Sequence, residues 1–309
     1  MKKYLFKRLL LSLVTLWAVI TITFVLMHSV PGNPFAKEGK MPKVIYENLQ
    51  KQYGLDKPLP EQYVIYLGNL LKGDFGDSMK SRTETVNEMI NRGFPVSARL
   101  AVQALLIAVI LGPALGALAA LNQNKALDYF SMIVAIIGIS VPSFIMGTVL
   151  IQFVARNVSW LPIGGWGTWN HTVLPSFALS LMPLATMARL MRSSMLEVLG
   201  QDYIKTAKSK GITKAAVVYK HAVRNAILPV VSVLGTIISN LLVGSFVIEK
   251  IFGIPGLGKF FTTSISNRDY TLIMGTTIFY SLILIIMLFI VDIAYMFIDP
   301  RIKLTKEGH

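Results

Sequence analysis

The chain has 309 residues, of which 53% are apolar and only 15% are charged, and its formal net charge is +14. A soluble domain of this length has about 25% charged residues. The apolar residues here are gathered in blocks, so the composition argues against a soluble enzyme and favours a bilayer environment. The absence of cysteine excludes disulfides, thiolate metal sites and cysteine nucleophiles, and the four scattered histidines give little support to a metal cluster. The positive charge indicates either nucleic acid or an anionic membrane surface as a partner.

Six apolar stretches are long enough to cross a bilayer, which takes about 20 residues in a helix. The fourth stretch is the weakest because it contains Pro175 and Pro183, which membrane helices tolerate where neighbouring groups satisfy the freed backbone. The sequence therefore predicts an all-α fold, a polytopic transmembrane helical bundle of about six spans. The predicted spans are residues 9–30, 100–121, 131–154, 172–188, 226–246 and 272–298.

The first stretch follows four lysine and arginine residues within residues 2–8, so a secretory signal peptide is an alternative interpretation. The apolar core of a signal peptide has about 7 to 15 residues and ends at a small-residue cleavage site. Here the apolar run covers residues 9–30 and is followed by Pro31. We therefore interpret the stretch as a retained transmembrane helix.

The excess of basic over acidic residues is larger on one side of the predicted bundle, and most basic residues of the other side lie in the segment 31–99, which is too long for its charges to count. With the N-terminus in the cytoplasm, the cytoplasmic pieces are residues 1–8, 122–130, 189–224 and 299–309. They hold 16 of the 30 Lys and Arg residues but only 5 of the 16 acidic residues. Because basic residues next to the spans stay on the cytoplasmic side, we expect both termini to be cytoplasmic.

The segment between the first two spans, residues 31–99, is external in this topology and mixes helix formers with Gly and Pro breaks. Its tyrosines and leucines recur regularly, so we interpret it as an external cap of short helices rather than as a linker. The chain is accordingly predicted to have two parts: residues 1–98, with the first helix and the cap, and residues 99–305, with the transmembrane core.

Residues 253–259, Gly-Ile-Pro-Gly-Leu-Gly-Lys, come within one residue of a phosphate-binding P-loop. That motif requires Ser or Thr at the next position to ligate magnesium, and Phe260 stands there instead. The segment also falls in a predicted external loop, where no ATP is expected. A Gly/Pro-rich re-entrant turn between the fifth and sixth helices is the better interpretation.

An ion-driven carrier would place acids, histidines or arginines inside its spans as relays and counter-ions. Besides the marginal His28, Asp292 is the one ionisable residue within the six predicted spans. We expect Asp292 to have a structural role near the cytoplasmic interface, with a proton relay as the alternative. The predicted spans therefore contain no evident energy source.

The predicted cytoplasmic loop at residues 189–224 holds eight basic residues and two acidic ones. Its composition predicts a helix over residues 197–210, a break at Gly211 and a second helix over residues 214–224. Three interpretations of this charge compete. Anchoring to lipid headgroups explains the basic residues beside helix ends, and nucleic-acid binding is not expected of a membrane protein. Docking of a partner protein explains two helices around a glycine hinge. We assign Arg189, Arg192 and Arg224 to the membrane boundary and the lysines from Lys205 to Lys214 to docking.

Residues 202–211, Asp-Tyr-Ile-Lys-Thr-Ala-Lys-Ser-Lys-Gly, with Ile-Leu-Pro at 227–229, resemble the EAA loop of binding-protein-dependent ABC importer permeases. The general pattern of that loop is Glu-Ala-Ala, three residues and Gly, with a later Ile-x-Leu-Pro. This chain has Lys-Thr-Ala at 205–207, and a longer distance from Gly211 to the proline, as in the peptide/nickel branch of the family.

Further short segments, in order along nearly the whole chain, resemble that branch and, within it, B-type permease subunits of oligopeptide importers. They are Gly-Leu-Asp at 54–56, Gly-Asp-Phe-Gly-Asp-Ser at 73–78, Phe-Pro-Val-Ser at 94–97, Leu-Pro-Ile-Gly-Gly at 161–165, Glu-Lys-Ile-Phe-Gly-Ile-Pro-Gly-Leu-Gly at 249–258, Asn-Arg-Asp-Tyr at 267–270 and Asp-Pro-Arg at 299–301.

The resemblance implies the ABC importer type I permease fold and a non-catalytic subunit, without a cofactor of its own, that moves peptides inward across a bacterial inner membrane. The implied partners are a second homologous permease subunit, two cytoplasmic ATPase subunits that bind ATP and Mg, an external substrate-binding (lipo)protein and membrane lipid, with no nucleic acid. The EAA loop, about residues 195–229, would lie in a groove of one ATPase.

Two sets of site residues follow from this reading. The ATPase-coupling residues are expected to be Asp202, Lys205, Thr206, Ala207, Lys208, Lys210 and Gly211. The structural-motif residues are expected to be Pro229, Gly253, Pro255, Gly256, Gly258, Arg268, Asp269, Asp292, Asp299, Pro300 and Arg301.

Two alternatives remain at this point. One is a self-sufficient ion-coupled carrier or channel, which would depend on Asp292. The other concerns cargo within the ABC class, because similar permeases carry dipeptides, nickel or glutathione. The absent cysteines and scattered histidines disfavour a nickel pathway lined by soft ligands.

Overall fold

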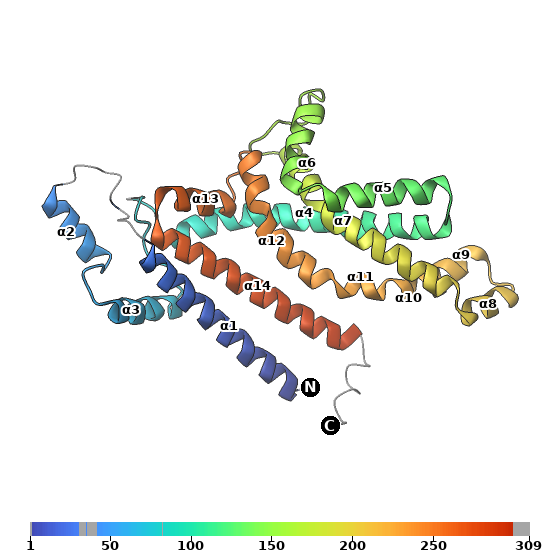
Figure 1. The fold of residues 1–309 in the computed structure, drawn as a ribbon, viewed down its shortest axis with the longest axis horizontal. Coiled ribbons are helices and arrows are strands. Elements are labelled where there is room, and N and C mark those ends of the chain that lie inside the picture. Colours follow the sequence, from blue (N-terminus) through green and yellow to red (C-terminus); the bar gives the residue numbers. More distant parts are fainter. Residues whose placement is uncertain (1, 31–34, 36–41, 82, 299–309) are drawn as a thin grey trace. The chain divides into compact units, whose positions relative to one another are not determined.

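The computed structural model describes residues 2–30, 35, 42–81 and 83–298, and within these residues every regular element is a helix (Figure 1). The predicted all-α class is therefore confirmed. The chain divides into two compact units, Met1–Pro95 with Gly256–Phe289 (unit 1) and Val96–Pro255 with Ile290–His309 (unit 2). Two long helices, α4 (Val86–Leu121) and α14 (Tyr270–Ile298), run from one unit into the other.

Unit 1 contains the first helix and the predicted external cap. Its remaining helices are α1 (Lys2–Ser29), α2 (Lys43–Gln52), α3 (Leu59–Leu71) and α13 (Leu257–Asn267). The short helices α2 and α3 confirm the interpretation of this segment as helical rather than as a linker. The hydroxyls of Tyr63 and Thr21 lie 2.6 Å apart, and His28 Nε2 lies 3.0 Å from Gln62 Oε1, so α3 is hydrogen-bonded along α1.

Unit 2 is built around α7 (Asn170–Leu199), which contacts α5, α6, η3, α10, α11 and α12. The other bounds in this unit are α5 (Ala126–Ser140), α6 (Ser143–Leu150), η2 (Ile151–Ala155), α8 (Asp202–Ser209), α9 (Lys214–Ala216), η3 (Val217–Val223), α10 (Arg224–Ala226), α11 (Leu228–Ser232) and α12 (Leu234–Ile251). The predicted fourth span, weakest by composition because of its two prolines, thus forms the centre of the unit. In its most apolar window 61% of the residues are buried.

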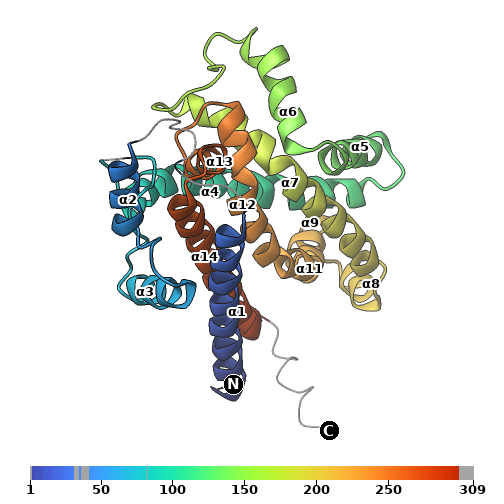
Figure 2. The ribbon, with the colours of Figure 1, turned by 60° about the vertical axis from the view of Figure 1, so that its left-hand side comes forward.

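Five helices are long and apolar enough to cross a membrane, α1, α4, α7, α12 and α14. The third predicted span, 131–154, is not straight: α5 and the α6–η2 segment meet at a bend of 108°, visible in Figure 2. Pro142 has no amide hydrogen to continue the helix, and Val141 before it adopts extended angles (φ −92°, ψ 115°). If this bent pair is one span, the chain has up to six, as predicted.

The helices extend beyond the predicted spans and therefore contain ionisable residues besides Asp292 and His28. Helix α12 ends at Ile251, five residues after the predicted span, and so includes Glu249, whose exposed fraction is 0%. Helices α5 and α7 likewise include Asp128 and Arg192.

Candidate functional site

The basic segment, defined here as residues 200–226, continues directly from α7 through α8, a turn and α9, η3 and α10 (Figure 1). The predicted single helix over 197–210 is wrong, because α7 ends at Leu199 and Gln201 adopts extended angles (φ −71°, ψ 151°) before α8 begins. The predicted break at Gly211 and the second helical stretch from Lys214 are confirmed.

Helix α8 is held in place by one apolar face. Ile204 and Ala207, three positions apart and therefore on the same side of the helix, are 0% and 6% exposed, and α8 packs against η3. The Asn225 amide also donates a hydrogen bond of 2.9 Å to the Tyr203 hydroxyl, which ties α8 to the residues after η3. Contacts and this hydrogen bond therefore link α8 to η3 and α10, and both of these contact α7.

Gly211 forms the turn after α8 in the left-handed conformation, with φ +75°. Its amide donates to the Lys208 carbonyl at 3.0 Å, and the Ile212 amide donates to the Ala207 carbonyl at 3.3 Å, which closes the helix end. A Cβ on Gly211 would meet no atom within 4 Å. The glycine is therefore required by the backbone conformation and not by lack of space.

Six of the seven predicted coupling residues are exposed on α8 and the turn: Asp202, Lys205, Thr206, Lys208, Lys210 and Gly211. Lys205 Nζ lies 2.8 Å from Asp202 Oδ1, an exposed pair that contributes little to stability. Among the described residues Lys208 and Lys210 form no salt bridge. The seventh, Ala207, is buried, so its role is to pack α8 against its own unit rather than to contact a partner.

Arg192 was assigned to lipid headgroups, and the structure corrects this. Its guanidinium binds Asp128 on α5 through two hydrogen bonds, of 2.6 Å to Oδ1 and 2.7 Å to Oδ2. Asp128 also accepts from the amide of Asn124, which has a left-handed φ of +60°. The side chain of Asp128 is 4% exposed, against 25% for Arg192. Arg189 and Arg224 are exposed and remain candidates for the membrane boundary.

Asp128→Asn is expected to destabilise the chain by about 2 kcal/mol, less than the roughly 3–5 kcal/mol of a fully buried pair because Arg192 keeps some contact with water. The apparent Tm in detergent should fall by about 4–6 °C, and the exchange Asp128→Arg with Arg192→Asp should recover part of the loss. Asp202→Asn, which breaks the exposed pair with Lys205, is the matched control. An equal shift in the two single variants would contradict the structural role of the Asp128–Arg192 pair.

The motif at residues 253–258 connects α12 to α13. Gly253 has φ +64°, and a Cβ on Gly164 would lie 2.5 Å from the Phe252 carbonyl oxygen, so two chain segments approach closely here. Gly256 directly precedes α13, and Gly258 is buried in its first turn. A P-loop follows a strand, whereas this segment follows a helix, so the interpretation as a turn stands.

Asp269 fixes the start of α14. Its Oδ1 accepts hydrogen bonds from the amides of Leu272 and Met79, both at 3.1 Å, and its Oδ2 accepts from the Ser78 hydroxyl. The carboxylate therefore caps α14 and holds the loop at residues 78–79 against it. Arg268 before it ends α13 in the left-handed conformation, with φ +58°.

The remaining predicted motif residues belong to other segments of the chain. Pro229 is in the first turn of α11, where a missing amide hydrogen is tolerated. Pro255 is half-buried in the turn before α13, and Asp292 is half-buried on α14. Asp299, Pro300 and Arg301 lie outside the described residues.

Sequence reasoning missed three functional features. Asp128 and Arg192 are separated by 64 positions, so no local pattern joins them. The pairing of Tyr203 with Asn225 spans 22 positions. The helix α13 was hidden inside a segment interpreted only as a turn, although eleven residues without proline follow Gly256.

The chain is similar over its whole length to known transport proteins. The family described as "Binding-protein-dependent transport system inner membrane component" matches residues 112–304, and its N-terminal companion family matches residues 1–101. The dipeptide transport system permease protein DppB of Bacillus subtilis is 52% identical over 100% of both chains. The oligopeptide transport system permease protein OppB of Haemophilus influenzae is 44% identical over 98% of this chain and 100% of its own.

A crystal structure of an amino acid ABC transporter with histidines matches with a TM-score of 0.52 at 17% identity, covering 66% of this chain and 92% of that one. This likeness confirms the predicted ABC importer permease fold. The family consists of membrane-embedded permease subunits that are not themselves catalytic, and its members lie in the inner membrane. The chain belongs to the binding-protein-dependent transport system inner membrane component family.

Proposed function

We propose that this chain is a permease subunit of an ATP-binding-cassette importer for short peptides and that the basic segment couples it to cytoplasmic ATPases. The exposed lysines around the Gly211 turn, on an element anchored by Ile204 and Ala207, are the observation that carries the coupling role. Two relatives that match essentially the full chain, at 52% and 44% identity, are named as dipeptide and oligopeptide permeases, and these names support the cargo class.

The proposed mechanism follows from the packing of unit 2. A partner that grips the exposed side of α8 moves a rigid element, because the opposite face is packed against η3. Both η3 and α10 contact α7, the central helix of the unit. ATP-driven closure of the ATPases would thus shift α7 and switch the permease between two states. Such a switch requires that the ATPases bind the two states with different affinity.

The proposed assembly supplies what this chain lacks. A second permease subunit would complete the pathway, two cytoplasmic ATPases would bind ATP and Mg, and an external binding protein would deliver the peptide. The basic segment would then be cytoplasmic, together with both termini, and α2 and α3 would be external. The distribution of Lys and Arg supports this orientation, and exposed Arg189 and Arg224 would meet lipid headgroups.

Reconstitution in liposomes tests the proposal. We expect ATP-dependent uptake of a labelled dipeptide when both permeases, the ATPases and the binding protein are present, and no uptake when the ATPases are omitted. The alternative, an ion-coupled carrier, predicts uptake by this chain alone under a proton or sodium gradient, abolished by Asp292→Asn. Gradient-driven uptake without the ATPases would overturn the proposal.

Cargo size is measured in the same system. Competition of the labelled dipeptide by unlabelled peptides of two to six residues gives the preferred length, and nickel and glutathione serve as competitors from the other cargo classes. The two relatives are named for different peptide lengths, and each name describes only that relative's cargo. The competition series therefore decides between dipeptides and longer peptides for this chain.

A further inference from the structure

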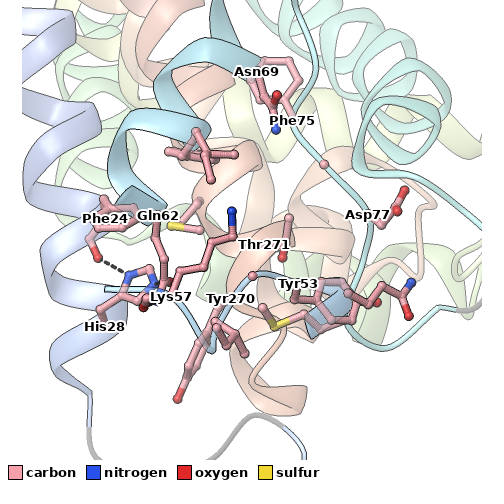
Figure 3. A pocket seen from close by; sticks show the side chains of 18 of the residues that line it. Phe24, His28, Tyr53, Lys57, Gln62, Asn69, Phe75, Asp77, Tyr270 and Thr271 are labelled. Carbon is pink, nitrogen blue, oxygen red and sulfur yellow. Dashed lines mark hydrogen bonds between the residues drawn. The ribbon is translucent and has the colours of Figure 1, made fainter. Parts of the chain in front are cut away.

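Unit 1 contains a cavity of about 410 Å³, and none of its lining residues belongs to the basic segment. Its walls come from the end of α1, the turn after α2, α3, the loop at residues 74–77 and the first turn of α14 (Figure 3). Cavities of roughly 300–1,000 Å³ with apolar walls and a few polar groups are typical of small-molecule sites. Five chain segments therefore enclose a space of the size that a small ligand needs.

The walls combine aromatic rings with groups that recognise charge and peptide bonds. Phe24 and Tyr270, which are 5% and 8% exposed, provide buried aromatic surface. Figure 3 shows Lys57 on the side of Phe24 and His28, and Asp77 on the opposite side. Both signs of charge are thus present at one cavity.

Four polar side chains of the cavity have unused hydrogen-bonding capacity. The Tyr66 hydroxyl is buried and has no partner within the described residues. Burial raises the pKa of this phenol, so the hydroxyl stays a neutral donor at physiological pH. In the same part of the chain, the side chains of Asn69 and Asp77 make no hydrogen bond, while Asp74 uses one oxygen for the Gly76 amide at 2.8 Å. A buried polar group without a partner is costly unless a ligand satisfies it, and this cost applies to the Tyr66 hydroxyl, because Asn69 is half-buried and Asp74 and Asp77 are exposed.

We propose that this cavity binds a short peptide with a free amino terminus. Its carbonyl oxygens would accept hydrogen bonds from Tyr66 and Asn69, its ammonium group would lie against Asp77 and Asp74, and the aromatic walls would contact its side chains. The inference rests on the proposed peptide cargo. It adds a peptide-binding site to the translocation pathway, and in the proposed orientation this site lies outside the membrane. Occupancy would bridge α3 to the start of α14, where Asp269 caps the helix.

Binding of dialanine to the purified full-length chain in detergent, measured by calorimetry, tests the site. We expect saturable binding that Tyr66→Phe weakens about fivefold, the effect of one lost hydrogen bond, while Tyr219→Phe, at an exposed tyrosine outside the cavity, leaves it unchanged. N-acetyl-dialanine, which lacks the ammonium group, should bind more weakly than dialanine. Asp77→Asn should remove most of this difference.

No saturable binding, or equal affinity in the native chain and the Tyr66→Phe variant with an unchanged Tm, overturns the inference. Uptake by the complete reconstituted system separates the two proposals. ATP-dependent dipeptide uptake without binding to this cavity would leave the proposed function standing and remove the site. A system that takes up no peptide would instead contradict the proposed function.

Discussion

Gly211→Pro is expected to abolish ATP-dependent peptide uptake while the chain still inserts and the ATPases still hydrolyse ATP. Proline fixes φ near −65°, and Gly211 has φ +75°, so the variant cannot form the native turn. Proline also removes the amide that donates to the Lys208 carbonyl. In addition it disfavours the helical conformation of the preceding residue, Lys210, whose angles are φ −76° and ψ 4°. The exposed end of α8 would therefore be displaced from its anchored face.

The measurement is uptake and ATP hydrolysis in the same liposomes, expressed as peptides transported per ATP. We expect this ratio to fall at least about tenfold, which corresponds to about 1.4 kcal/mol in the barrier of the coupled transport step. Gly167→Pro is the control, because Gly167 in the loop before α7 also has a positive φ, +142°, and open surroundings, and it lies outside the proposed coupling residues. If Gly211→Pro transports with the native ratio, the turn has no part in coupling.

Reversal of two charges, Lys208→Glu with Lys210→Glu, is expected to weaken the association of the chain with the ATPases. Both lysines are exposed and, within the described residues, form no salt bridge, so the change alters the surface without breaking an internal contact. Two charges change sign at the proposed interface, so its net charge falls by four units. Like charges across an interface cost affinity and slow association, so we expect at least about tenfold weaker binding at low salt.

Titration of the purified ATPases against the permease in nanodiscs measures this effect. The matched control is Lys51→Glu with Lys72→Glu, which makes the same change of net charge on exposed residues of unit 1 that form no salt bridge within the described part of the chain. Salt screens exposed charges beyond about 8–10 Å, so the difference between variant and native chain should shrink in high salt. Equal affinity of the two double variants would exclude a docking role for these lysines.

The local backbone of the basic segment could be predicted from the sequence, but its packing could be predicted only in part. The break at Gly211 and the helix after it were predictable, because a glycine between two runs of helix formers specifies the local backbone. The orientation of α8 was not predictable to the same extent. Its pattern places Ile204 and Ala207 on one face, but the resemblance to the EAA loop suggested that Ala207 contacts the ATPase. The packing of α8 against η3 shows instead that Ala207 is buried.

The ion pair of Arg192 could not be predicted from the sequence. An arginine near a helix end is an ordinary candidate for lipid headgroups, and nothing in the neighbouring residues indicates another partner. The structure brings it to Asp128, 64 positions earlier in the chain, where two short hydrogen bonds fix both side chains. Glu249 likewise lies outside the predicted fifth span, because that prediction stops where the apolar run ends. The helix α12 continues beyond the apolar run to Ile251.

The sequence by itself determined that this is a helical membrane protein with about six apolar blocks, short helices after the first block and a basic segment broken at Gly211. These properties depend on hydropathy and on backbone preferences, which are carried by neighbouring residues. Tertiary structure alone decided the 108° bend, the central position of α7, the Asp128–Arg192 pair and the cavity in unit 1. Each of these depends on contacts between segments far apart in the chain, whose proximity no local pattern encodes.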